Sequence, residues 1–244
     1  MTYDLTGHKA VVSGAGRGIG RGCAEALANS GAEVIAIARS ADDLASLASH
    51  ASGRIDTWQG DVTDSNMHQR IRELNGLTML VNNAGANRPQ PFPLVDTASL
   101  DQVIDLNIRA AFLVSQAATV AMLRNKSGGS IVHMSSQMGH VGSPDRSVYC
   151  MTKHAIEGLT KACAVELAPE RIRVNSVAPT FVETPLTKPM LDDPEFKKFV
   201  LGMIPSGRLA SVDDIVSATL FLLSPQAGMV TGHSLVVDGG WTAR

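Results

Sequence analysis

The chain has 244 residues, of which 44% are hydrophobic and 18% charged, and its formal net charge is −2. This near-neutral balance argues against a protein that binds nucleic acid or an anionic membrane surface, because such proteins carry clustered basic residues. No uninterrupted apolar run approaches the roughly 18 residues of a membrane span, and the amino terminus does not resemble a signal peptide. The cysteines (Cys23, Cys150 and Cys163) lack metal-binding spacing, so we expect no metal site and a cytoplasmic protein.

Short apolar segments alternate with longer helical patterns along the whole chain. The expected strands are 9–13, 33–38, 54–58, 78–82, 130–135, 173–178 and 234–238. The expected helices are 20–30, 41–48, 100–124, 148–167 and 212–223. Apolar strands separated by helices indicate parallel strands joined by right-handed crossovers. We therefore predict a single α/β domain over residues 1–244, a Rossmann-type doubly wound parallel sheet of about seven strands with helices on both faces.

The segment 180–205 is the least regular part of the sequence, because it is rich in proline and charge. It leaves the carboxyl end of an expected strand, which is the edge where α/β sheets bind ligands. We predict that it is a substrate-binding lid loop rather than a disordered insertion.

A glycine-rich loop follows the first expected strand and opens into a helix. Its glycines fit the spacing GxxxGxG (Gly14, Gly18, Gly20) and depart from GxGxxG, because Ile19 stands where that pattern has glycine. Glycines permit a close approach of the backbone, and a helix amino terminus offers free N–H groups to a pyrophosphate. The loop predicts a nucleotide-binding site rather than a plain turn.

The end of the second expected strand indicates which nucleotide is bound. NAD sites usually place an acidic residue there to hold the ribose 2′-hydroxyl, whereas this chain has Ala38, Arg39 and Ser40. Arg39, together with Arg17 in the glycine loop, suits a 2′-phosphate because the guanidinium is a planar fork. We predict a preference for NADP(H) over NAD(H).

Tyr149 precedes Lys153 by four positions in an expected helix, so both side chains lie on one face, one turn apart. A nearby ammonium favours the phenolate, and we expect the pKa of Tyr149 to fall below its usual value of about 10. Such a tyrosine donates and accepts a proton near neutral pH. Alone, this spacing is a weak signal that chance often supplies.

Taken in order, these motifs resemble the classical short-chain dehydrogenase/reductase family over nearly the whole chain. The further matches are Asp61-Val62, Asn82-Asn83-Ala84-Gly85, Asn107, Ser136 thirteen positions before Tyr149, Asn175, Pro179 and Asp238-Gly239-Gly240. Departures are Ser13, where threonine is commoner, and Thr180, where many relatives have glycine. The runs at 147–153, 172–180 and 227–240 are most similar to the xylulose reductase and tetrameric carbonyl reductase branch.

The resemblance implies hydride transfer between a nicotinamide and a carbonyl or secondary alcohol. It implies that Ser136, in preference to Ser135, holds the substrate oxygen, that Tyr149 exchanges the proton, and that Lys153 tunes the tyrosine. Asn107 is expected to hold a water that links Lys153 to solvent. The expected cofactor-binding residues are Gly14, Arg17, Gly18, Ile19, Gly20, Arg39, Asp61, Val62, Asn82, Ala84, Gly85, Tyr149, Lys153, Val182 and Thr184.

The expected substrate-binding residues are Ser136, Gln137, His140, Arg146 and Tyr149. Gln137, His140 and Arg146 are polar enough to bond the hydroxyls of a sugar-like substrate, or they are solvated loop residues. We predict a ketose, polyol or dicarbonyl substrate.

Three alternatives remain at this point, and the oxidation of a steroid or another secondary alcohol is the first. A 3-oxoacyl-(acyl carrier protein) reductase needs a basic rim to dock its acidic carrier, but Ser127 and Glu170 are not basic there, although Arg124, Lys126 and Arg171 lie close by in the sequence. A non-catalytic NADP sensor on the same fold is the third alternative. The resemblance also implies a homotetramer, consistent with long helices at 100–115 and 148–167 that have more apolar positions than one buried face requires.

Overall fold

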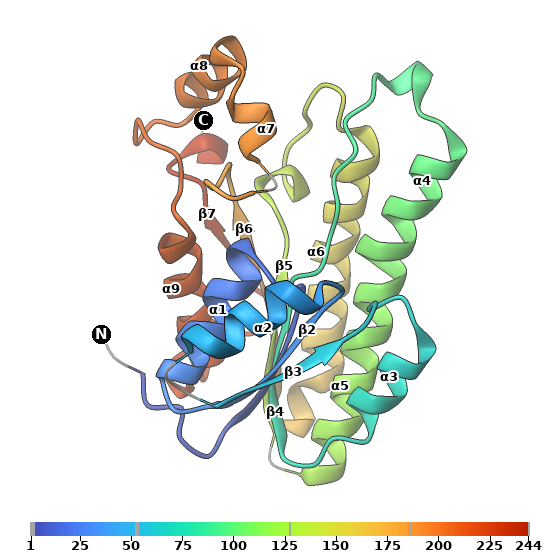
Figure 1. Cartoon of the computed structure of the whole chain (residues 1–244), viewed down its shortest axis with the longest axis vertical. Helices are drawn as coiled ribbons and strands as arrows, with labels where there is room; N and C mark the ends of the chain where they lie inside the picture. The colour runs from blue at the N-terminus through green and yellow to red at the C-terminus, as the bar shows by residue number, and fades with distance from the viewer. Residues whose placement is uncertain (1–2, 52–53, 127, 186, 244) are drawn as a thin grey trace.

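The computed structural model describes residues 3–51, 54–126, 128–185 and 187–243. Within these residues seven parallel strands form one sheet in the order β3-β2-β1-β4-β5-β6-β7 (Figure 1). The strands are β1 (Lys9–Ser13), β2 (Glu33–Ala38), β3 (Ile55–Gln59), β4 (Leu77–Asn82), β5 (Gly129–Met134), β6 (Ile172–Pro179) and β7 (Ser234–Val237). The predicted doubly wound Rossmann-type sheet is confirmed.

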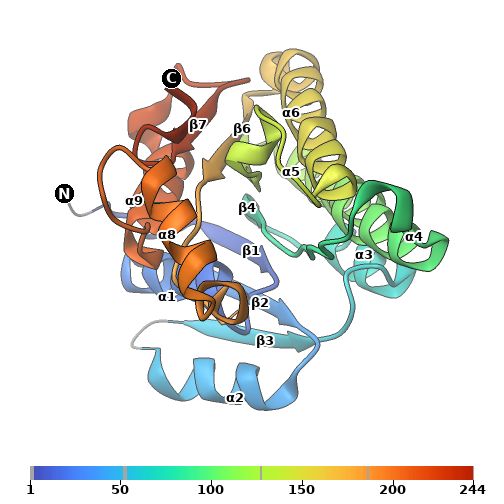
Figure 2. The ribbon, with the colours of Figure 1, turned by 90° about the horizontal axis from the view of Figure 1, so that it is seen from above.

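Helices cover both faces of this sheet. They are α1 (Gly18–Asn29), α2 (Ala41–His50), α3 (Ser65–Arg72), α4 (Thr97–Ile104), α5 (Ala111–Asn125), α6 (Ser147–Leu167), α7 (Lys188–Leu191), α8 (Pro194–Met203) and α9 (Val212–Leu223). Short 3₁₀ turns are η1 (Phe92–Leu94), η3 (Gln137–Gly139), η4 (Ala168–Glu170), η5 (Pro225–Ala227) and η6 (Trp241–Ala243), and η2 (Asp105–Ala110) is a π-helical turn. Figure 2 shows α4, α5 and α6 on one side of the sheet and α1 and α9 on the other.

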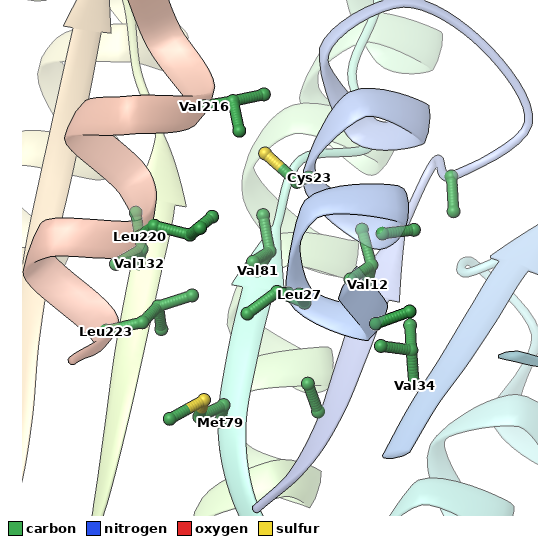
Figure 3. Packing of buried hydrophobic residues seen from close by; sticks show 14 of the residues in the cluster. Val12, Cys23, Leu27, Val34, Met79, Val81, Val132, Val216, Leu220 and Leu223 are labelled. Atoms are coloured by element: carbon green, nitrogen blue, oxygen red, sulfur yellow. The ribbon is translucent and has the colours of Figure 1, made fainter. Parts of the chain in front are cut away.

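Each face of the sheet has its own apolar core, because successive strand residues point to opposite faces. Val12, on β1, is fully buried beneath α1 together with Leu27 of that helix (Figure 3). Its neighbour Val11 is buried in the core on the opposite face of the sheet. Burying a side chain of this size contributes about 1.5–3 kcal/mol. The two cores hold the sheet rigidly, so the loops at its carboxyl edge start from fixed positions.

The predicted helix at 100–124 is interrupted. It consists of α4 and α5 joined by the π-helical turn η2, and this turn contains Asn107. By length and composition the whole stretch Thr97–Asn125 is apolar enough to cross a membrane, with a mean hydropathy of 1.4 in its most apolar window. However, 50% of that window is buried, and α5 packs on β4 and α3, as expected of a helix in a protein core.

The prediction of a loop over 180–205 is wrong in part, because this segment contains α7 and α8. Pro189 and Pro194 lie in the first turns of these helices, where a missing backbone N–H removes no hydrogen bond. Asp193 caps α8 by accepting a hydrogen bond from the backbone N–H of Glu195 at 3.0 Å. In Figure 1 the two helices lie beyond the carboxyl ends of the strands. The segment therefore covers the edge where the candidate site is found.

Candidate active site

The glycine loop between β1 and α1 lies against the loop that follows β4. The hydroxyl oxygen of Ser13 accepts hydrogen bonds from the backbone N–H groups of Asn83 at 2.9 Å and Ala84 at 3.1 Å. The amide of Asn83 in turn donates to the carbonyl oxygens of Ser13 and Gly14. The serine that departs from the common threonine thus still joins the two loops through its hydroxyl.

The geometry of this loop fits the pyrophosphate of a dinucleotide. Gly14 and Gly18 have φ angles of +65° and +57°, and a Cβ on Gly14 would lie 2.9 Å from the side-chain nitrogen of Asn83. Arg17 precedes the first residue of α1, and its side chain does not cap the first turn. The amino-terminal N–H groups of α1 and the positive end of its dipole are therefore available to an anion.

Two exposed arginines lie at the ends of the glycine loop and of β2. Arg17 is exposed in the loop, and the side chain of Arg39 is 75% exposed, with its Nη1 atom 3.9 Å from Oδ2 of Asp61. Asp43, in the first turn of α2, lies beside Gly16, so one carboxylate also borders this region. The arginines fit a ribose 2′-phosphate, because each presents an exposed planar fork.

The other residues that were expected to bind the cofactor differ in their burial and in the direction of their side chains. Thr184 is brought to the glycine loop, where a Cβ on Gly18 would lie 3.5 Å from its methyl carbon. Val62 and Val182 are buried. The side chain of Asn82 faces the interior, where it donates to the carbonyl oxygen of Ala111 at 2.7 Å and accepts from the hydroxyl of Ser13 at 3.3 Å.

Tyr149 and Lys153 lie on one face of α6, as predicted. The ammonium nitrogen of Lys153 lies 5.5 Å from the centre of the Tyr149 ring and donates a hydrogen bond to the carbonyl oxygen of Met134 at 2.7 Å. Lys153 is almost fully buried, at 6% exposure. The side chain therefore ends between the tyrosine and the carboxyl end of β5.

The expected fall in the pKa of Tyr149 is wrong for this structure. Burial raises the pKa of Tyr149 to about 12, although a hydrogen bond with Ser136 lowers it in part. The cost of removing the phenolate from water exceeds the favourable interactions. Burial also lowers the pKa of Lys153 to about 8, against the raising effect of Glu157. Near neutral pH the pair is consequently a phenol beside an ammonium.

Asn107 connects α6 to the loop after β4. Its Oδ1 atom accepts from the backbone N–H of Ala86 at 2.8 Å, and its Nδ2 atom donates to the carbonyl oxygen of Ala86 at 2.8 Å and to the hydroxyl of Thr152 at 3.1 Å. A π-helical turn redirects side chains relative to a regular helix and is frequent at functional sites. The turn η2 thereby directs Asn107 toward the chain beside Gly85, where a Cβ would lie 3.3 Å from Oδ1 of Asn107 and 3.8 Å from the Lys153 nitrogen.

A cavity of about 260 Å³ lies over Tyr149 and Ser136, slightly smaller than the roughly 300–1,000 Å³ of typical small-molecule sites. Its lining residues are Asn87, Pro89, Ser136, Gln137, Met138, Tyr149, Thr180, Phe181, Thr187 and Met190. Ser135 points elsewhere, since its buried hydroxyl is not part of this lining. Sequence reasoning missed Asn87, Phe181 and Met190, because they come from separate segments that carry no local pattern.

Two residues expected to bind substrate lie outside the lining. The Nε2 atom of His140 is 2.9 Å from the hydroxyl of Ser234 and 3.6 Å from Oε1 of Glu157. The structure thus directs His140 toward β7 and α6 rather than into the cavity. Arg146 lies behind the cavity wall and donates a hydrogen bond to the sulfur of Met190 at 3.3 Å.

Comparison with known proteins agrees with this geometry. A family model described as enoyl-(acyl carrier protein) reductase matches residues 14–242. L-xylulose reductase from Bos taurus is 41% identical over 244 residues, which is 100% of both chains. The chain belongs to the classical short-chain dehydrogenase/reductase family. D-erythrulose reductase from Gallus gallus, another similar protein, is 40% identical over 247 residues and 99% of both chains.

A solved member of the same family supports the assignment at the level of structure. A putative 2-deoxy-D-gluconate 3-dehydrogenase from Agrobacterium tumefaciens, with bound NADP, is 34% identical, covers 100% of this chain and 99% of its own, and has a TM-score of 0.93. As a short-chain dehydrogenase/reductase, the chain is an NAD(P)-dependent oxidoreductase that interconverts carbonyl and alcohol groups of small molecules.

Proposed function

We propose that this enzyme reduces small polyhydroxylated ketones with NADPH and oxidises the corresponding polyols with NADP⁺. The observation that carries this proposal is a set of buried polar atoms around the cavity, Oδ1 of Asn87, Oε1 of Gln137 and Oγ1 of Thr180, which have no hydrogen-bond partner among the described residues. Buried polar atoms are costly unless they are paired. A ligand that fills the cavity is therefore expected to supply the missing hydrogen bonds.

The chemistry of these atoms distinguishes between the predicted substrates. The carboxamide oxygens of Asn87 and Gln137 are acceptors and need O–H or N–H donors. A ketose or polyol carries such hydroxyl donors on the carbons next to its reacting group, whereas an α-dicarbonyl carries only acceptors. The names of the xylulose and erythrulose reductases to which the chain is similar support the same substrate class.

The preference for NADP(H) is supported by charge. Arg17 and Arg39 are exposed beside the glycine loop, and the end of β2 carries no acidic residue to hold a ribose 2′-hydroxyl. When bound, the nicotinamide supplies the hydride for reduction or accepts it in oxidation. The first turn of α1 and the glycine loop would hold the pyrophosphate.

The side chains of the cavity supply the remaining chemistry. In reduction, the hydroxyl of Ser136 donates a hydrogen bond that orients the carbonyl, and the phenol of Tyr149 donates its proton to the carbonyl oxygen. The ammonium of Lys153 stabilises the phenolate that remains. Asn107 fixes the loop after β4 beside Lys153 and, in this proposal, holds the water through which the proton is replaced.

A substrate panel tests this function. Turnover of ketoses, polyols, α-dicarbonyls and acetoacetyl thioesters is measured by absorbance with both NADPH and NADH, or with their oxidised forms. We expect the highest kcat/KM for a small ketose with NADPH. Activity on acetoacetyl thioesters alone would identify a carrier-protein reductase, and binding of NADPH without turnover of any substrate would identify a sensor.

The positions of the basic residues give less support to a 3-oxoacyl-(acyl carrier protein) reductase. Arg124, Lys126 and Arg171 lie next to the amino-terminal ends of β5 and β6, at the opposite edge of the sheet from Tyr149. Ser127 lies outside the described residues. A basic rim for an acidic carrier is therefore not formed by these residues around the cavity of the same chain.

We also propose that the enzyme is a homotetramer, as the family resemblance implies. Phe112 on α5 and Met151 and Val165 on α6 are 47%, 47% and 80% exposed, which gives this helix pair an apolar outer surface. A separate cavity of about 170 Å³ between α5 and α6 is lined in part by Phe112. Large exposed apolar patches usually mark interfaces. A monomeric mass by light scattering would exclude the tetramer.

A further inference from the structure

A buried carboxylate lies behind the candidate proton donor. Glu157 is on α6, one helical turn after Lys153, and is only 6% exposed. Its Oε2 atom accepts a hydrogen bond from the hydroxyl of Ser176 at 2.8 Å, and its Oε1 atom has no hydrogen-bond partner in the described part of the chain. Burying a carboxylate is costly unless a cation compensates it. Its position therefore calls for a functional explanation.

The ionisable groups that face this carboxylate are few. Lys153 precedes it by four positions on α6, a spacing that places both side chains on one helix face. From the turn after η3, Nε2 of His140 lies 3.6 Å from Oε1, which is an ion pair when the imidazole is protonated. The neighbouring strands β6 and β7 contribute only the hydroxyls of Ser176 and Ser234 to these contacts. Lys153 is thus the cation that shares a helix face with this carboxylate.

A second histidine, His133 on β5, is close enough to Lys153 for the lysine charge to affect its pKa. Burial and, to a smaller extent, the charge of Lys153 together lower the pKa of His133 to about 4. His133 is hydrogen-bonded on both ring nitrogens, to the hydroxyls of Ser115 and Thr160, each at 2.9 Å. As a neutral group it does not compete for the carboxylate.

The turn that carries Ser136 packs directly on this group. A Cβ on Gly139 would lie 2.9 Å from the hydroxyl oxygen of Ser135, 3.1 Å from the carbonyl oxygen of Lys153 and 3.2 Å from Cγ of Glu157. Glycine at this position lets η3 approach α6 closely. The carboxylate is consequently enclosed between α6, η3 and the sheet, where its field is weakly screened by water.

We propose that Glu157 is a positioning residue of the reduction, whose buried carboxylate, fixed by Ser176 and enclosed by His140, keeps Lys153 an ammonium beside Tyr149. The inference rests on the role proposed above for Lys153. The hydrogen bond of the ammonium to Met134 ends on a neutral carbonyl, so it does not supply the compensating charge. Burial lowers the pKa of Lys153 to about 8, and the Glu157 carboxylate opposes this effect.

The test is the pH dependence of reduction in Glu157→Gln, which keeps the shape of the side chain and an acceptor for Ser176. We expect the alkaline limb of kcat to move to lower pH by about one unit, with the KM of the carbonyl substrate unchanged. In Glu157→Asp, which retains the charge, the alkaline limb should lie close to its position in the parent enzyme. In the matched control Glu170→Gln, at an exposed position in the turn η4 that follows α6, the alkaline limb stays at the pH of the parent enzyme.

A second readout does not require turnover. The side-chain nitrogen of Lys153 is followed by ¹⁵N NMR as pH is raised in the parent protein and in the variants, and its titration is expected to move down by the same unit in Glu157→Gln. An unchanged titration of Lys153, or an unchanged limb, overturns the inference. If Glu157→Gln does not fold, Glu157→Asp serves as the test. The pKa of Lys153 is then expected to fall by less than one unit, and an unchanged pKa overturns the proposal. Absence of turnover in the parent enzyme would count against the proposed function alone.

Discussion

The proton-transfer residues and the substrate cavity are built in different ways. Tyr149 and Lys153 are one turn apart on a single helix, and Ser136 is the second residue after β5, so short-range geometry holds them. The cavity above them takes Asn87 from the loop after β4, Phe181 from the segment after β6 and Met190 from α7. Reaction type is thus set by local structure, whereas substrate choice depends on contacts between distant segments. Substitutions in the first region should change kcat for every substrate, and those in the second should change KM selectively.

The largest expected effect is that of Tyr149→Phe. Loss of the phenolic proton should lower kcat about 10³-fold for every carbonyl substrate, because general acid catalysis contributes on this scale. The Kd for NADPH, measured by fluorescence titration, should not change. Tyr3→Phe, at the only other tyrosine, is the matched control and should retain full turnover. A Tyr149→Phe enzyme that kept wild-type kcat would remove Tyr149 from the mechanism.

Arg39→Asp should raise the KM for NADPH about 30-fold, because a charge-assisted hydrogen bond to phosphate is worth about 1.5–3 kcal/mol. The KM for NADH should fall or stay constant. Arg54→Asp provides a control, since Arg54 is equally exposed but pairs with Glu33 near the amino end of β3. Equal effects of the two substitutions on NADPH would show that Arg39 acts only through overall charge.

The rate of reduction should decline as pH rises through about 8. Burial lowers the pKa of Lys153 to about 8, so its ammonium is present below this pH and lost above it, while Tyr149, with a pKa raised to about 12, keeps its proton. At pH 9 we expect kcat about tenfold below its plateau. A profile of kcat between pH 6 and 10 measures this, and a constant rate up to pH 10 would exclude Lys153 as the limiting group.

Gln137→Leu should have the smallest effect of the four and sharpen the comparison most. Removing a neutral acceptor costs about 1 kcal/mol, so KM for a ketose should rise about fivefold while kcat stays within a factor of about two. The KM for an α-dicarbonyl should hardly change, because this substrate has no hydroxyl to donate. Equal changes for both substrates would show that Gln137 shapes the cavity without recognising hydroxyls.

The sheet was predictable from the sequence because most of its strands contain short apolar runs; β1, for example, begins and ends where the pattern places it. The helix α3 was missed because Met67 and Ile71 are its only apolar residues, and apart from them only His68 is buried. In α7 and α8 the prolines suggested a loop, but at the first turn of a helix proline is favourable. Secondary structure is therefore mispredicted from the sequence where few residues of a helix are buried, or where a proline is compatible with both a loop and the first turn of a helix.

For the site, spacing placed Ser136, Tyr149 and Lys153 correctly in one another's neighbourhood but gave the wrong sign for the tyrosine pKa. The shift depends on burial, which arises from the fold as a whole. His140 was expected at the substrate because it is close to Ser136 in the sequence. Its contacts with Glu157 and Ser234, which direct it away from the cavity, depend on the fold and are not visible in the sequence. The substrate cavity, assembled from distant segments, had no local signal at all.

The most direct measurement is the transfer of deuterium from NADPH labelled at carbon 4 of its nicotinamide, on the transferred side, to a small ketose. The proposed function predicts that mass spectrometry finds one deuterium on the carbinol carbon of the polyol product, formed about 10³-fold more slowly by Tyr149→Phe. A polyol without deuterium, or no polyol under conditions where an acetoacetyl thioester is reduced, would contradict the assignment of this enzyme as a ketose reductase.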